Sequence, residues 1–350
     1  MEKCNNRIIT LSGDPASGKG TISKQLKTFY EAEGHKVHIV SVGDLFRKVS
    51  IREYKKMFPE VSNPTIEQIN SNPDFAAKLK EIDGSIDTEI AKLGEEINSE
   101  PRPNEVFIID SRVAWHMIPE SFAVRLTVDA ETAGKRVFND KTRGAEDKYA
   151  SVENAIADTK VRREEEIERY QKLYGIDLTN QNNYDLIIGT TLASINDIAQ
   201  TIKICEERER DCLYFSKTWA SPELFYPTQT VFDTYSKTSF TAGLTPEELA
   251  ESIKENGIYP YDPVISTTIT DSPYQFVSDG HHRVFASIMA GQTLIPYEAR
   301  KNVGKATVQD RRSLSQIYDH EDIHRPDGTL FRYEKYPEID GEIKEYDVER

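Results

Sequence analysis

Apolar and polar positions alternate along residues 7–210 in a way that favours an α/β fold. Short apolar runs, typical of buried strands, are followed by segments whose apolar residues recur at spacings of three and four, typical of helices. The expected strands are 7–12, 36–42, 106–110, 124–129 and 184–189, and the expected helices are 21–33, 74–98, 151–174 and 195–210, with an irregular insertion at 58–73. Buried strands separated by helices indicate a parallel sheet with helices on both faces.

The pattern changes after residue 212, where Tyr, Phe, Thr and Ser become frequent. The expected elements are a helix from 245 that ends at Gly257, strands at 263–269 and 274–277, a helix at 284–290, a strand at 294–299 and a hairpin turn at 325–329. Residues 301–350 are polar and end in an acidic tail. The sequence predicts a first domain (1–205), a charged linker (206–212) and a smaller α+β domain with a polar C-terminal extension (213–350).

A glycine-rich segment joins the first predicted strand to the first predicted helix. It reads Gly13-Asp14-Pro15-Ala16-Ser17-Gly18-Lys19-Gly20-Thr21. Glycines let backbone N–H groups turn inward around an anion, and a helix N-terminus adds partial positive charge. In this context the segment predicts a phosphate-binding loop, in which Gly13, Ser17, Gly18, Lys19, Gly20 and Thr21 hold ATP. A mobile Gly/Ser turn is the alternative.

Charged residues gather where the predicted strands end, which is where ligands bind in parallel sheets. Asp110 closes an apolar run and, with the Thr21 hydroxyl, is a candidate for binding Mg²⁺. A cap or turn role for Asp110 is the alternative. Arg112 and Arg47 are candidates for binding phosphate, because phosphoryl transfer needs several cations around the transferring group.

A polar segment at 140–147 and the charged helix after it have the composition of a lid that closes over nucleotide. Its candidate arginines are Arg143, Arg163 and Arg169. The alternative is a solvated helix, because Arg and Glu at i,i+4 commonly decorate an exposed face.

Composition narrows the functional classes. The net charge of −15 disfavours broad nucleic-acid binding. No run of about 18 apolar residues occurs, so we expect no membrane span. The N-terminus leads almost directly into a strand without room for a signal peptide, and the three cysteines lack metal-ligand spacing. We therefore expect a cytoplasmic protein with free thiols.

Residues 7–200 resemble the cytidylate kinases, particularly their compact archaeal-type branch. The phosphate loop with Gly20 after the lysine, the segment Gly43-Asp44-Leu45-Phe46-Arg47, and Asp110-Ser111-Arg112 follow in the family's order. The resemblance continues through Arg163-Glu164, Arg169-Tyr170 and the strand at 184–188. It implies that Asp44, Arg47 and Arg112 bind the acceptor monophosphate, and that Lys19, Arg112, Arg163 and Arg169 are catalytic. Asp110-Ser111 departs from the family pattern, and the 58–73 insertion lies in the acceptor region.

Residues 212–300 resemble the ParB/sulfiredoxin-like domain. The resemblance rests on Asp279-Gly280-His281-His282-Arg283 and on Gly291 followed by Leu294-Ile295-Pro296. It implies a second nucleotide site at Gly280, His281, His282 and Arg283, with Asp279 near an acceptor hydroxyl; Glu223 is the nearest candidate for the upstream partner acid. A helix-capping Asp279 beside packed histidines is the alternative.

Together these features predict an ATP- and Mg²⁺-dependent kinase that converts a nucleoside monophosphate, CMP or dCMP by resemblance, to the diphosphate. Two alternatives stay open. One is a nucleotide-binding regulatory protein; the other is a bifunctional protein whose second domain phosphorylates a small molecule such as free serine or hydrolyses nucleotide.

Overall fold

The computed structural model describes residues 6–140, 149–226, 246–268, 273–299 and 324–331. The chain forms two compact units. The first comprises Met1–Ile187 and Ile202–Glu206, and the second comprises Ile188–Thr201 and Glu207–Arg350. The predicted boundary at 205 and the 206–212 linker stay predictions; residues 206–210 lie inside helix α8 (Ile195–Arg210).

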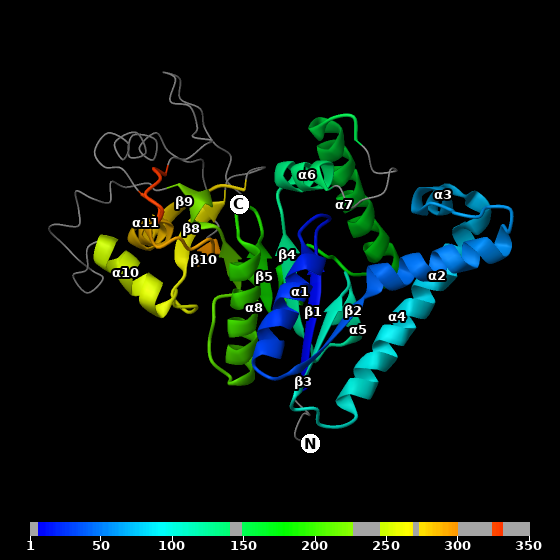
Figure 1. Ribbon diagram of the computed structural model, residues 1–350, viewed down its shortest axis with the longest axis horizontal. Coiled ribbons are helices and arrows are strands. Elements are labelled where there is room, and N and C mark those ends of the chain that lie inside the picture. Colours follow the sequence, from blue (N-terminus) through cyan, green and yellow to red (C-terminus); the bar gives the residue numbers. More distant parts are fainter. Residues whose placement is uncertain (1–5, 141–148, 227–245, 269–272, 300–323, 332–350) are drawn as a thin grey trace. The chain divides into compact units, whose positions relative to one another are not determined.

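The first unit is built on the predicted parallel sheet (Figure 1). The strand order is β2-β3-β1-β4-β5. β1 pairs in parallel with β3 and β4, and β2 pairs in parallel with β3. The bounds are β1 (Arg7–Gly13), β2 (Lys36–Ser41), β3 (Glu105–Asp110), β4 (Phe122–Thr127) and β5 (Leu186–Gly189).

Alternating side chains of β1 bury opposite faces of this sheet. Ile8 belongs to the apolar cluster made with α4 (Ala76–Asn98) and α5 (Ala114–Met117). Arg7 lies on the other face, where its guanidinium stacks on Tyr30 of α1 (Lys19–Ala32). Helices therefore cover both faces, as the pattern predicts. Helix α1 begins at Lys19, earlier than the predicted Thr21.

The 58–73 insertion is not irregular throughout, which corrects the expectation from its Pro and Asn residues. It follows α2 (Val42–Met57) and contains α3 (Ile66–Ser71) before the short η1 (Pro73–Phe75). Thr65 and Gln68 form a capping box that satisfies N–H groups at the α3 N-terminus. Ile69 and Phe75 are fully buried, so apolar packing outweighs the breakers.

Two helices and a short η segment complete the described part of the chain before α8. They are α6 (Ala130–Asn139), α7 (Val152–Tyr174) and η3 (Gln181–Asn183). Helices α6 and α7 pack closely because Gly134 has no side chain. A Cβ at this position would lie 2.4 Å from Ile156 Cγ1. The predicted lid segment, including Arg143, lies outside the described residues.

The second unit contains a mixed sheet with the order β6-β10-β8-β9-β7. β10 pairs antiparallel with β6 and parallel with β8, and β9 pairs antiparallel with β8. The bounds are β6 (Thr218–Ala220), η4 (Pro222–Leu224), β7 (Phe225–Tyr226), α10 (Pro246–Asn256), β8 (Val264–Thr268), β9 (Gln275–Asp279), α11 (His281–Met289) and β10 (Ile295–Ala299). Phe225 and Phe285 anchor its core. In the described parts of both units, no helix is long and apolar enough to cross a membrane.

Candidate active site

The glycine-rich loop turns back over the end of β1. Gly18, the N-cap of α1, has a φ of 88°, in the left-handed region that glycine adopts without strain. At Gly13 a Cβ would lie 2.4 Å from the Leu126 carbonyl oxygen, so no larger residue fits there. The Asp14 N–H donates to the same carbonyl at 3.0 Å. The sequence therefore forms the predicted strand–turn–helix.

Lys19 folds back over this turn. Its Nζ donates to the carbonyl oxygens of Gly13 at 3.0 Å and Asp14 at 3.4 Å. Burial of the ammonium group, aided by the nearby charge of Arg112, lowers the pKa of Lys19 to about 8. The side chain is therefore still charged at neutral pH and is available to an anionic ligand.

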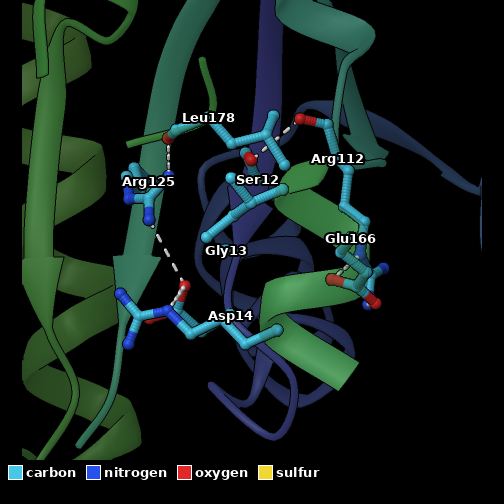
Figure 2. A pocket seen from close by; sticks show the side chains of 9 residues that line it. Ser12, Gly13, Asp14, Arg112, Arg125, Glu166 and Leu178 are labelled. Carbon is cyan, nitrogen blue, oxygen red and sulfur yellow. Dashed lines mark hydrogen bonds and ion pairs between the residues drawn. The ribbon is translucent and has the colours of Figure 1, made fainter. Parts of the chain in front are cut away.

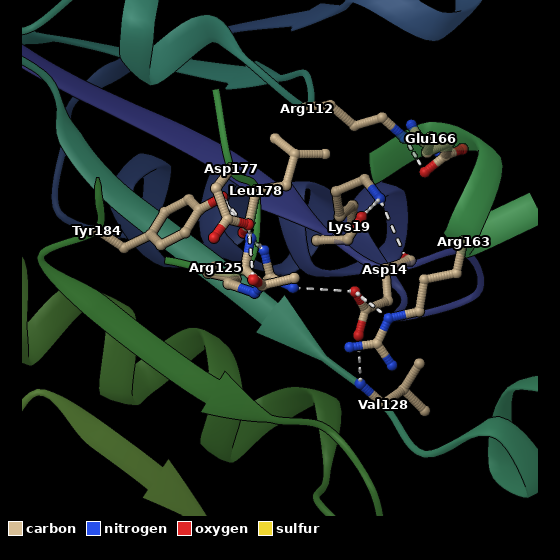
Figure 3. A network of polar contacts seen from close by, with 12 residues as sticks. Asp14, Lys19, Arg112, Arg125, Val128, Arg163, Glu166, Asp177, Leu178 and Tyr184 are labelled. Carbon is tan, nitrogen blue, oxygen red and sulfur yellow. Dashed lines mark hydrogen bonds and ion pairs between the residues drawn. The ribbon is translucent and has the colours of Figure 1, made fainter. Parts of the chain in front are cut away.

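Asp14 connects the loop to two other elements (Figure 3). Its buried carboxylate accepts hydrogen bonds from Arg125 at 3.3 Å and from the Val128 N–H at 3.3 Å. It also lies 3.5 Å from the Nε of Arg163 on α7. Sequence reasoning assigned no role to Asp14, although its place inside the loop motif was a signal.

Arg125 was missed as well. It is only 6% exposed on β4. Besides Asp14, it donates to the Leu178 carbonyl and to the Tyr184 hydroxyl, and it lies over the Tyr184 ring. A single arginine inside an apolar strand was the available signal, because a buried charge needs partners.

Arg112 and Glu166 form a two-point ion pair between the end of β3 and α7. Arg112 Nε and Arg112 Nη2 each donate to a Glu166 oxygen at 2.6 Å. Burial alone would lower the pKa of Arg112, but the Glu166 carboxylate outweighs this effect and raises it. Glu166, in the charged helix for which the sequence left both a lid role and a solvated face open, was a third residue missed.

These side chains surround one pocket (Figure 2). Three guanidinium groups and two carboxylates line it, above the end of β1. The lining residues are Ser12, Gly13, Asp14, Arg112, Arg125, Arg163, Glu166, Ile167 and Leu178. Of the predicted catalytic residues, Arg112 and Arg163 are therefore brought together beside the loop that carries Lys19.

Asp110 and the predicted acceptor residues belong to the same charged neighbourhood. Burial raises the pKa of Asp110, while the charges of Lys19 and Arg112 oppose that rise. Asp44 and Arg47 form an ion pair in the first turns of α2, and the hydrogen bond from Arg47 lowers the pKa of Asp44. The charge of Asp44 also raises the pKa of Asp110, and the charge of Arg47 lowers it.

Arg169 lies elsewhere on α7. Its guanidinium pairs with Asp83 of α4, and it is not among the residues that line the pocket. Tyr174, one turn further along α7, donates to Asp87 of α4. In this structure Arg169 therefore joins α7 to α4 and does not contact the phosphate loop.

The second predicted site is a turn between β9 and α11. Gly280, not Asp279, is the N-cap residue, with a φ of 92° and no side-chain cap hydrogen bond. The capping part of the alternative is therefore wrong, whereas its packed histidine is confirmed for His281, which is buried. Arg283 pairs with Asp262 and lies 3.6 Å from Asp279. Burial lowers the pKa of His281 to about 4, with the neighbouring His282 as a lesser cause.

The comparisons with known proteins place the first unit in a family. Residues 8–192 match the model of the cytidylate kinase-like family, which is more than half of the chain. The chain belongs to the cytidylate kinase-like family. The cytidylate kinase of Methanocella arvoryzae is 30% identical over 184 residues, which cover 53% of this chain and 87% of that relative.

A second relative of this chain is much longer than the chain itself. The S-adenosylmethionine-dependent nucleotide dehydratase of Lacinutrix mariniflava is 30% identical over 197 residues, which cover 55% of this chain and 34% of that relative. This chain therefore spans about a third of that protein's length. Among solved structures, shikimate kinase from Acinetobacter baumannii aligns with a TM-score of 0.34 and 17% identity, over 60% of this chain and 96% of that one.

The family match ends at residue 192. The ParB/sulfiredoxin-like resemblance of residues 212–300 and the second nucleotide site therefore stay predictions.

Proposed function

We propose that the first unit transfers a phosphoryl group from ATP to a nucleoside monophosphate, with CMP or dCMP as acceptor. One observation carries the proposal: in a chain of the cytidylate kinase-like family, Arg112, Arg125 and Arg163 line a single pocket at the phosphate loop. Lys19, partly buried and still charged at neutral pH, belongs to that loop. Positive groups fixed before substrate arrives can stabilise the charge of a transferring phosphoryl group without reorganising.

The loop fits a polyphosphate donor. The hydroxyl of Ser17 is buried, and it has no hydrogen-bond partner among the described residues. A phosphate oxygen would satisfy it, as it would the N–H groups at the start of α1. In this proposal Gly13, Gly18 and Gly20 shape the cradle, and Lys19 contacts the donor phosphates.

The residues also fit Mg²⁺, which prefers oxygen ligands and keeps several waters and phosphate oxygens. Asp110 and the Thr21 hydroxyl are the proposed protein ligands. The described residues contain no cluster of three or more acidic, His or Cys side chains suited to a metal. One or two oxygen ligands are what Mg²⁺ bound through nucleotide phosphates requires. Bound Mg²⁺ would neutralise phosphate charge.

The acceptor monophosphate would bind between Arg112 and the Asp44–Arg47 pair. Arg163 would act from α7 on the transferring group, and Arg169 would hold α7 against α4 or turn inward with a closed lid. The acceptor phosphate is already anionic, so no general base is needed and positioning dominates the chemistry.

A coupled assay of ADP release against CMP, dCMP, the other monophosphates and free serine tests the proposal. We expect turnover with CMP or dCMP that falls by about 100- to 1000-fold in Lys19→Ala, the scale for losing one fixed transition-state donor. Lys24→Ala, an exposed change on the same helix, is the matched control. ATP binding without ADP release for any acceptor would refute the kinase and support a nucleotide-binding regulatory protein.

The second unit offers a second candidate function, favoured by the left-handed glycine at the N-terminus of α11. A helix N-terminus points backbone N–H groups and partial positive charge toward an anion. We propose that Gly280, His281, His282 and Arg283 form a second nucleotide site, with Asp279 near an acceptor hydroxyl. Serine-dependent ADP release that survives Lys19→Ala but not Asp279→Ala would support it. Binding of one ATP per chain, with no ATP bound by Lys19→Ala, would contradict it.

A further inference from the structure

We infer that Glu166 is a built-in counter-ion that competes with substrate phosphate for Arg112 and so sets how tightly the pocket binds anions. This inference rests on the proposed function, because it assigns Arg112 to phosphate. It goes further by giving a role to an acidic residue that faces the pocket. Glu166 acts on substrate through Arg112 and is a positioning residue.

The contact has the geometry of a phosphate contact. A guanidinium presents a planar pair of N–H donors that binds a carboxylate or a phosphate in the same two-point way. Arg112 uses Nε and Nη2 for Glu166, at 2.6 Å each. A phosphate oxygen pair that seeks the same edge of Arg112 must displace the Glu166 carboxylate.

The charges around the pocket explain why a counter-ion is needed. Arg112, Arg125 and Arg163 line the pocket, and the charge of Arg112 already lowers the pKa of Lys19 on the adjoining loop. Asp14 and Glu166 are the carboxylates in the pocket lining. Glu166 also acts on Lys19, where its charge opposes the lowering of the pKa. A negative charge at Glu166 therefore stabilises the empty site and disfavours a second anion beside it.

The two carboxylates differ in how easily they can yield. Asp14 is 6% exposed and is held by a backbone N–H as well as by Arg125, so it is part of the loop's own structure. The Glu166 side chain keeps 22% exposure, and it accepts two hydrogen bonds from the flexible side chain of Arg112. Glu166 can thus swing toward solvent when phosphate arrives, whereas Asp14 stays.

Calorimetric titration of the full-length protein with inorganic pyrophosphate tests the inference independently of catalysis. We expect Glu166→Gln to bind pyrophosphate roughly tenfold more tightly, the scale of one charge-assisted hydrogen bond freed for the ligand. Glu165→Gln, an exposed change on the same helix, should leave the affinity at the parent value. Equal or weaker binding by Glu166→Gln, including no detectable binding by either protein, overturns the inference.

A double-mutant cycle separates competition for Arg112 from a general change in charge. In an Arg112→Ala background, Glu166→Gln should give no gain in pyrophosphate affinity. A gain of the same size without Arg112 would overturn the competition. Thermal unfolding of each variant checks that α7 remains folded, and Glu166→Asp, which keeps the charge on a shorter side chain, must not reproduce the Gln result.

Turnover gives a second signature. If the kinase proposal holds, Glu166→Gln should lower the KM for CMP and also lower kcat, because the diphosphate product is released more slowly. Tighter pyrophosphate binding without turnover for any acceptor would refute the kinase and leave the counter-ion role standing. Turnover by Glu166→Gln with an unchanged KM and an unchanged pyrophosphate affinity would support the kinase and refute the counter-ion role.

Discussion

Two turns in this molecule share one backbone plan and differ in charge. Gly18 and Gly280 each cap a helix in the left-handed conformation (φ 88° and 92°) and precede a basic residue. A loop joins the end of β1 at Gly13 to Gly18, whereas Gly280 follows β9 directly. In the first unit that residue is Lys19, whose pKa burial lowers to about 8. In the second it is His281, whose pKa burial lowers to about 4. At neutral pH the first turn therefore holds a partly buried cation, and the second turn holds a buried neutral ring.

The neighbours explain the difference. Carbonyl oxygens of Gly13 and Asp14 accept from Lys19, and the Asp110, Glu166 and Asp14 carboxylates favour its charge. His281 is 8% exposed, and the charge of Asp279 offsets its burial only partly. The shape of the turn alone therefore does not define a phosphate site. The charge of the residue after the glycine, which the surrounding fold determines, distinguishes the two turns.

The largest expected effect follows from the neutral His281. Its pKa is lower in the folded state than the unfolded value of 6.5, so between these values the unfolded chain binds more protons. Stability of the second unit is therefore fully present above about pH 6.5 and is lost as the pH falls toward 4, by roughly 3 kcal/mol. His281→Gln should flatten this part of the pH profile.

The two tryptophans make the measurement specific. Trp115 lies in the first unit and Trp219 in the second, so Trp115→Phe leaves fluorescence that reports the second unit. Unfolding by denaturant is followed at several pH values, with His282→Gln as the neighbouring control. Identical pH profiles for the parent and His281→Gln would mean that His281 is not held neutral.

The sequence predicted the elements that depend on neighbouring residues. Apolar runs and glycine positions predict the strands, the loop and the helix after it. The structure contains these elements, with bounds that differ by a few residues. Helix α3 was missed because Pro59, Asn63 and Pro64 mask a short segment. Its capping pair, Thr65 and Gln68, was the readable signal.

The candidate site was predicted less completely, because its ion pairs join distant parts of the chain. Asp14 and Arg125 are separated by 111 positions, and Arg112 and Glu166 by 54. An arginine-rich stretch on α7 predicts cations but not their partners. Arg163 faces Asp14, whereas Arg169, a turn and a half further on, faces Asp83.

A smaller effect tests the charge of Lys19 in the first of the two turns. Since Lys19 is protonated below about pH 8, we expect pyrophosphate affinity to be level from about pH 7 to 8 and to fall by up to about tenfold per pH unit above it. Titrations at a series of pH values measure this. Lys19→Ala should show weaker binding without the added loss, which also corrects for titration of the ligand. A parent profile level to about pH 9 would mean that Lys19 keeps its ordinary pKa.

The smallest effect concerns the backbone that the two turns share. Gly18→Ala and Gly280→Ala should each destabilise their unit by about 1 kcal/mol, because alanine is strained at positive φ. Gly20→Ala is the matched control: it lies in the first turn of α1, has open space for a Cβ and should gain slightly in stability. At Gly280 a Cβ would also lie 2.9 Å from Arg283 Nη2, at the end of a flexible side chain that can shift. Denaturant unfolding, read from Trp115 for the first unit and Trp219 for the second, measures each change. Losses that differ by more than about 1 kcal/mol would show that the two turns do not share the same backbone requirement.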